Sequence, residues 1–131
     1  MEALVAVVED NEAVRDALAT ILGLEGYRVL AYPSGGEFIS SVRERQPDCV
    51  LLDLFMPEGS GAEVLQVLDT TSTPVIVISA EDETPEALAA INAGAWDFIK
   101  KPFDADTVLA RVRVALTNWP QDPPNQFCHR S

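Results

Sequence analysis

The chain has 131 residues, of which 21 are acidic and 9 are basic, so its formal net charge is −12. This length suits one compact domain that buries enough apolar surface to fold without a disulfide or a structural metal. The negative charge argues against binding to nucleic acid or anionic membranes, because both attract basic surfaces. No apolar segment reaches about 18 residues and the N-terminus has no signal-peptide pattern, so we expect a cytoplasmic protein without a membrane span.

Five short segments predict the strands of a parallel sheet. Residues 4–8, 50–52 and 75–78 are apolar at every position, which is typical of strands buried on both faces. Residues 27–31 and 96–99 mix polar and apolar side chains, which is typical of edge strands. Trp96 and Phe98 share a phase of the strand alternation, so we expect both on one face of the sheet.

Segments with helical periodicity separate the predicted strands. In the first, Val14, Leu18 and Leu22 recur on one helical face, and Gly26 follows as a C-terminal stop. Ser34 is a candidate N-cap for the second helix. The predicted helices cover residues 14–22, 34–46, 62–69, 84–93 and 104–116. A strand followed by a helix, five times over, predicts a doubly wound α/β fold with right-handed crossovers and helices on both faces.

The last residues of the chain show no periodicity. From residue 118 onward the sequence has three prolines and no apolar repeat. We therefore predict a domain over residues 1–117, followed by a Pro-rich tail or a truncated linker over residues 118–131. The chain is then either a stand-alone domain or the N-terminal part of a longer protein.

Polar residues follow the predicted central strands. Glu9 and Asp10 end the first, Asp53 ends the third, Ser79 ends the fourth, and Lys101 follows the fifth. The carboxyl ends of parallel strands meet at one edge of the sheet, where ligands of such folds bind. The sequence thus predicts that three carboxylates, a hydroxyl and an ammonium converge at this edge.

Three carboxylates in one place require a cation. Each pair at 4 Å repels by about 4 kcal/mol at an effective dielectric near 20. Mg²⁺ prefers hard oxygen ligands and binds through one or two carboxylates together with phosphate oxygens and water. A divalent cation beside a lysine is the equipment of phosphoryl transfer, and Asp53 could itself act as the nucleophile and form an acyl phosphate.

Four segments in this order resemble the receiver domain of bacterial two-component response regulators. They are Val-Val-Glu-Asp-Asn-Glu at 7–12, Leu-Leu-Asp-Leu-Phe-Met-Pro at 51–57, Ile-Ser-Ala at 78–80, and Gly-Ala-Trp-Asp-Phe-Ile-Lys-Lys-Pro-Phe at 94–103. The resemblance covers residues 4–116. It implies a flavodoxin-like sheet with the strand order 2-1-3-4-5, the order that chemotaxis regulators also have.

The resemblance also implies a metal site around the phosphoacceptor. By this similarity Asp53 accepts the phosphoryl group, and Asp10 and Asp53 bind Mg²⁺ (or Mn²⁺) directly. The backbone carbonyl of Phe55 completes the protein ligands, and Glu9 acts through water. The acidic pair is Glu-Asp where Asp-Asp is the commoner form in the family.

Further roles follow from the same resemblance. Ser79 and Lys101 contact the phosphoryl oxygens, and Ser79 and Phe98 form the switch. Phe55 and Glu81 flank the site and tune the lifetime of the phosphorylated form. The expected partners are a sensor histidine kinase or a phosphotransfer protein. Phosphorylation is expected to strengthen a homodimer or an effector contact on the face formed by residues 84–93, 96–99 and 104–116.

Simpler interpretations compete with these roles. Acidic pairs in loops usually face solvent, Asp53 could be a turn residue, and Phe98 is by default a core aromatic. Among other functions, a phosphohydrolase with an aspartate nucleophile needs a second acid at position 55, which is Phe. A flavin carrier needs phosphate donors after the first strand, where Glu9 and Asp10 would repel phosphate. A degenerate receiver would lack one of the five site residues, and none of the five is missing from this sequence. We therefore expect a receiver that is not an enzyme acting on a separate substrate.

Overall fold

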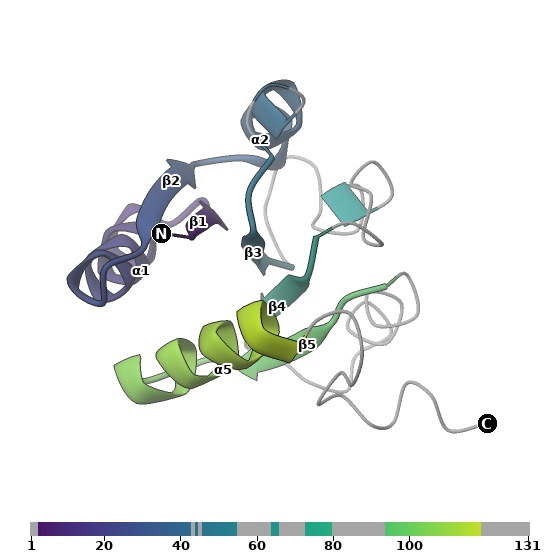
Figure 1. The fold of residues 1–131 in the computed structure, drawn as a ribbon. Coiled ribbons are helices and arrows are strands. Elements are labelled where there is room, and N and C mark those ends of the chain that lie inside the picture. The colour runs from purple at the N-terminus through teal and green to yellow at the C-terminus, as the bar shows by residue number, and fades with distance from the viewer. Residues whose placement is uncertain are drawn as a thin grey trace.

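A computed structural model of the chain describes residues 3–42, 44, 46–54, 64–65, 73–79 and 94–118 (Figure 1). Five strands and three helices have their bounds in this part of the chain. The strands are β1 (Leu4–Val8), β2 (Arg28–Tyr32), β3 (Cys49–Asp53), β4 (Val75–Ser79) and β5 (Asp97–Lys100). The helices are α1 (Glu12–Leu24), α2 (Gly35–Val42) and α5 (Ala105–Asn118).

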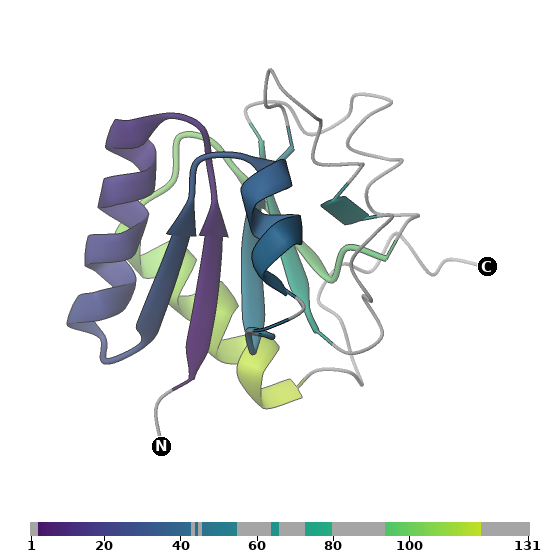
Figure 2. The same cartoon turned by 90° about the horizontal axis from the view of Figure 1, so that it is seen from above.

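The strands form one parallel sheet in the order β2-β1-β3-β4-β5. This confirms the predicted fold class and strand order, with β2 and β5 at the edges. Helices cover the sheet from both sides, and β1, β3 and β4 are accordingly apolar on both faces except at their last residues Asp53 and Ser79 (Figures 1 and 2). The arrowheads in Figure 2 show that β1 and β2 end at the same side of the sheet.

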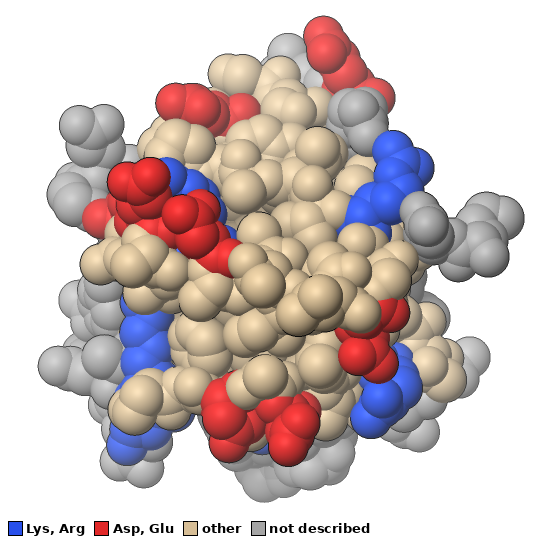
Figure 3. All heavy atoms as spheres, turned by 90° about the vertical axis from the view of Figure 1, so that its left-hand side faces the viewer, with Lys and Arg blue, Asp and Glu red and all other residues tan. Residues whose placement is uncertain are grey.

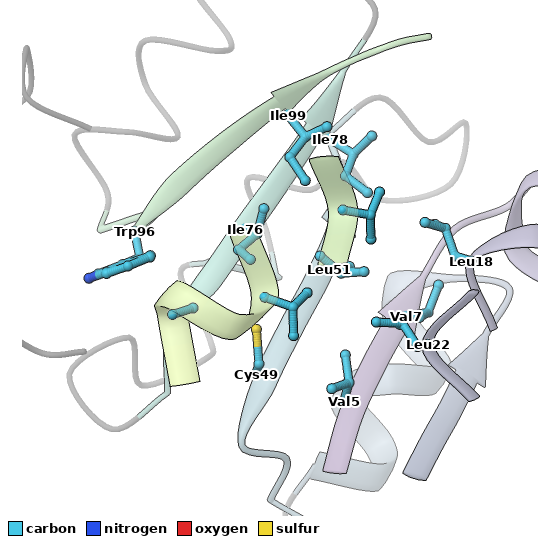
Figure 4. Close-up of a cluster of buried hydrophobic side chains, with 13 residues drawn as sticks. Val5, Val7, Leu18, Leu22, Cys49, Leu51, Ile76, Ile78, Trp96 and Ile99 are labelled. Carbon is cyan, nitrogen blue, oxygen red and sulfur yellow. The ribbon is translucent and has the colours of Figure 1, made fainter. Parts of the chain in front are cut away.

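Alternate residues of each strand build two separate cores. Odd residues of β1 point toward α1 and α5, and even residues point toward α2. Figure 4 shows the first core, in which side chains from β1, β3 and β4 meet Leu18 and Leu22 of α1. Cys49 lies in this core, and burial raises the pKa of its thiol to about 12, so the thiol stays protonated at neutral pH.

Local signals fix the ends of the helices. Asn11 caps α1 by accepting a hydrogen bond from the Val14 N–H at 3.1 Å. The helix therefore begins at Glu12, two residues before the apolar periodicity starts. Gly26 follows it with a φ of 102°, a left-handed conformation that favours glycine. Ser34 accepts from the Glu37 N–H at 3.2 Å, which confirms it as a cap of α2.

The prediction that Trp96 and Phe98 share a face is wrong. The last strand begins at Asp97, one residue later than predicted, so Trp96 lies outside the strand alternation. Its backbone N–H donates to the Val75 carbonyl, and its ring packs in the core beneath α1 and α5. Phe98 packs against the core on the α2 side. The edge strand β2 is likewise shifted by one residue, to Arg28–Tyr32.

The remaining predicted helices either have other bounds in the structure or lie outside the described residues. The second helix is shorter than predicted and ends at Val42. Of the helix predicted over residues 62–69 only Val64 and Leu65 are described, and both are buried. The helix predicted over 84–93 and the tail after residue 118 lie outside the described residues.

Acidic side chains gather in separate groups around a largely uncharged centre on the face shown in Figure 3. Within the described residues, no helix is both long enough and apolar enough to cross a membrane.

Two leucines of α1 provide a test of this packing. Leu18 is fully buried, whereas Leu24 is 85% exposed. We expect Leu18→Ala to lower the free energy of unfolding by about 3 kcal/mol, because it removes buried methyl groups and leaves a cavity. Leu24→Ala should change it by less than about 0.5 kcal/mol. Urea denaturation of both variants measures the difference, and similar losses would contradict the assignment of the buried face.

Candidate functional site

The polar residues predicted to converge lie at the carboxyl edge of the sheet. The register places Val8 opposite Leu52, and Asp53 opposite Ile78, so β1, β3 and β4 end at a common level. Ser79 is the last residue of β4, and its carbonyl accepts from the Lys101 N–H at 2.7 Å. The residues that follow or end these strands therefore face one small region.

Three carboxylates meet there. One oxygen each from Glu9, Asp10 and Asp53 lies within 4.8 Å of the others. Glu9 and Asp53 are buried, with 1% and 4% of their surface exposed, while Asp10 is exposed. The cluster thus has two carboxylates enclosed by protein and one at its opening to solvent.

Lys101 supplies positive charge to this cluster. Its Nζ lies 3.4 Å from Glu9 Oε1 and 3.7 Å from Asp53 Oδ2. One ammonium against three carboxylates leaves a net charge of −2 among these four side chains. Carboxylates at such short separations stay ionised together only beside further positive charge.

Each carboxylate oxygen of Glu9 has a polar contact. Its Oε2 accepts a hydrogen bond from the Asn11 N–H at 3.1 Å. Its Oε1 is buried and forms an ion pair with Lys101, but no atom of the described residues donates a hydrogen bond to it. A buried oxygen with spare acceptor capacity beside two other carboxylates is a site that a hydrated cation would satisfy. The donor set is all oxygen, so the residues present fit Mg²⁺ or Mn²⁺.

Ser79 and Phe98, the residues predicted to switch, lie on neighbouring strands. Ser79 is fully buried at the end of β4, and Phe98 is half-buried on β5. The register pairs Ser79 with Lys100 and Val77 with Phe98. The two predicted tuning residues, Phe55 and Glu81, lie outside the described residues.

The sequence analysis missed an ion pair next to Phe98. Asp97 Oδ1 lies 2.9 Å from Arg111 Nη1 of α5 and accepts from the Phe98 N–H at 2.7 Å. The same guanidinium nitrogen donates to the Phe98 carbonyl at 2.8 Å. Both backbone groups of Phe98 are therefore held by this pair. Burial raises the pKa of Asp97, and its hydrogen bond from Phe98 and the nearby Arg111 oppose that rise.

The fold and the acidic site are those of a known family of signalling domains. The chain belongs to the response regulator receiver domain family, which it matches over residues 5–113. A receiver domain is a signalling module.

Particular relatives agree with this assignment. The chain is 36% identical to the response regulator MprA of Mycobacterium sp. (strain KMS) over 124 residues, which cover 93% of this chain and 54% of that protein. It is 40% identical to the KDP operon transcriptional regulatory protein KdpE of Escherichia coli (strain K12) over 113 residues, 86% of this chain and 50% of that protein. The chain thus spans about half the length of these relatives.

Solved structures share the fold. A CheY-like response regulator receiver domain protein from Methanospirillum hungatei JF-1 superposes with a TM-score of 0.84 at 24% identity. The match covers 89% of this chain and 95% of that one.

The Asp97–Arg111 pair leads to a prediction about stability and pH. Arg111→Met leaves a buried carboxylate without its cation, and we expect the free energy of unfolding to fall by about 2 kcal/mol at pH 7. This lies below the usual cost of breaking a buried pair because the Arg111 side chain is 40% exposed. Urea denaturation at several pH values measures the loss, with the exposed Arg113→Met as the matched control on the same helix.

The pH dependence of that loss has a definite sign. The folded-state pKa of Asp97 already lies above its ordinary value of 3.8, and removing Arg111 raises it further. The loss of folding free energy caused by the ionised Asp97 carboxylate is then greatest at neutral pH. It vanishes as the pH falls below the pKa of Asp97 in the unfolded state, because the carboxyl group is then protonated in both states. The difference between wild type and Arg111→Met should therefore shrink as the pH falls toward 4. A difference independent of pH would contradict the pairing.

Proposed function

We propose that this chain is the phosphoacceptor receiver domain of a two-component phosphorelay, and that Asp53 takes a phosphoryl group from a phosphohistidine of a histidine kinase or a phosphotransfer protein. The observation that carries the proposal is the placement of Asp53. It is a buried carboxylate at the carboxyl edge of the sheet, 3.7 Å from the Lys101 ammonium and within 4.8 Å of two further carboxylates.

The chemistry is a displacement at phosphorus. An Asp53 carboxylate oxygen forms the new bond, and the bond from phosphorus to the histidine nitrogen breaks, with its electron pair returning to the imidazole. The product is an acyl phosphate on Asp53. Lys101 neutralises charge on the phosphoryl oxygens, and the Ser79 hydroxyl donates a hydrogen bond to one of them.

The acidic cluster supports a proposed set of metal ligands. Asp10 and Asp53 would hold Mg²⁺ directly with the backbone carbonyl of Phe55, and Glu9 would act through water. When bound, the cation supplies positive charge that offsets the carboxylates and the transferring phosphoryl oxygens. The fixed position of Glu9 and the short separations in the cluster support this assignment.

The output belongs to the same proposal. Ser79 moves toward the phosphoryl group and Phe98 turns inward, and the face that includes β5 and α5 then contacts an effector or a second copy. The contact of Arg111 with the Phe98 carbonyl supports a coupling between β5 and α5. Phe55 and Glu81 set the lifetime of the acyl phosphate.

The domain bounds are part of the proposal as well. Residues 1–117 form the receiver domain, and residues 118–131 form a tail or linker.

Phosphorylation with a small donor tests the proposal. In MgCl₂ and acetyl phosphate, the wild-type chain should gain one phosphate that is stable in acid and labile in base, measured by intact-mass spectrometry. EDTA should prevent the gain. Asp53→Asn should abolish it, because the amide is not a nucleophile, and Asp106→Asn, which changes an exposed carboxylate on α5, should leave it unchanged. Undiminished labelling of Asp53→Asn would refute the assignment.

The two adjacent lysines should differ in effect. Lys101 lies beside Glu9 and Asp53, whereas Lys100 is exposed on β5. Lys101→Met removes a charged contact with the phosphoryl group and should slow phosphorylation by acetyl phosphate by about tenfold to a hundredfold. Lys100→Met should change the rate by less than about twofold. Equal losses in the two variants would mean that Lys101 does not act at the site.

A further inference from the structure

We propose that Arg15 of α1 is a positioning residue that holds the turn bearing Glu9 and Asp10 in the form that binds the divalent cation. The inference rests on the proposed function, because it concerns the metal site of the phosphoacceptor. Arg15 is not a ligand of the cation, and it acts by positioning the acidic residues that are.

The need for such a residue follows from strand geometry. Successive residues of an extended strand point to opposite faces of the sheet. Glu9 and Asp10 are successive, yet their carboxylate oxygens lie within 4.8 Å of each other and of Asp53. β1 ends at Val8 and Asp10 lies in a bend, so the chain leaves the strand conformation at the acidic pair, and something must fix the turn that it makes there.

The described contacts show how this turn is held. The Glu9 N–H donates to the Tyr32 carbonyl at 3.0 Å, which continues the sheet, and the Asn11 N–H donates to Glu9 Oε2. Arg15 Nη1 donates to the Glu9 carbonyl at 2.9 Å and approaches the Asp10 carbonyl at 3.4 Å. The guanidinium thus joins the backbone of both acidic residues to α1.

The backbone of Arg15 is fixed within the first turns of α1. Its backbone N–H donates to the Asn11 carbonyl at 2.8 Å, and the Asn11 side chain caps the same helix. The side chain is partly buried where it reaches back over the turn. The turn is therefore braced by a helix whose buried face packs on the sheet, so a change at Arg15 should loosen the carboxylates without removing one.

Metal affinity is the direct test. Partners that orient metal ligands without binding the metal typically contribute 10- to 100-fold in affinity. We expect Arg15→Met to weaken Mg²⁺ binding by about tenfold, measured by isothermal titration calorimetry with MgCl₂ on the full chain, with MnCl₂ as a second probe. Arg15→Lys keeps a donor that can reach one carbonyl and should recover part of the affinity. Arg28→Met, which changes an exposed arginine on β2, is the control and should bind Mg²⁺ as the wild type does.

A purely structural role predicts a different result. If Arg15 positions the ligands, a saturating Mg²⁺ concentration should restore the rate at which acetyl phosphate labels Asp53 in Arg15→Met to within about twofold of the wild type. A defect that Mg²⁺ does not rescue, wild-type Mg²⁺ affinity in Arg15→Met, or loss of the folded state in both Arg15 variants would each overturn the inference. Failure of the wild type to be labelled on Asp53 would instead refute the proposed function.

Discussion

The mutual repulsion of three carboxylates at one edge of the sheet is the constraint on which the site depends. Glu9, Asp10 and Asp53 are brought together by the ends of β1 and β3, and Lys101 offsets only part of their charge. Such a cluster costs folding free energy unless further positive charge is present. The same feature makes the site a good cation site, because the repulsion is relieved when a cation binds.

The central strands provide the rigidity that holds this cluster. From Val5 to Val8, and through all of β3 and β4, every residue is buried between helices on the two faces. Strands packed on both sides resist movement, since any shift opens cavities in two cores at once. The acidic residues therefore lie at the ends of strands that are packed on both faces.

The sequence was informative where a side chain's role follows from strand position alone. Fully apolar segments predicted the buried strands, and the polar residues at their ends predicted which side chains would meet. It failed where a contact depends on three-dimensional packing. Trp96 was placed on the wrong face because the start of β5 is set by pairing with β4, and neither Arg111 nor Arg15 has a periodic signal, since each donates to a backbone carbonyl.

Those two arginines have related roles. Both α1 and α5 pack on the same face of the sheet, and each has one arginine whose guanidinium donates to a backbone carbonyl, just after β1 for Arg15 and within β5 for Arg111. Arg15 holds the turn after β1, which bears two of the acidic residues, and Arg111 holds Phe98 on β5. Because the carbonyls rather than the side chains are held, a movement of either backbone segment must strain or break a contact with its helix. The turn that bears Glu9 and Asp10 is thus tied to α1, and Phe98 is tied to α5. Because α1 and α5 pack on one shared core, both contacts depend on the same layer of the structure.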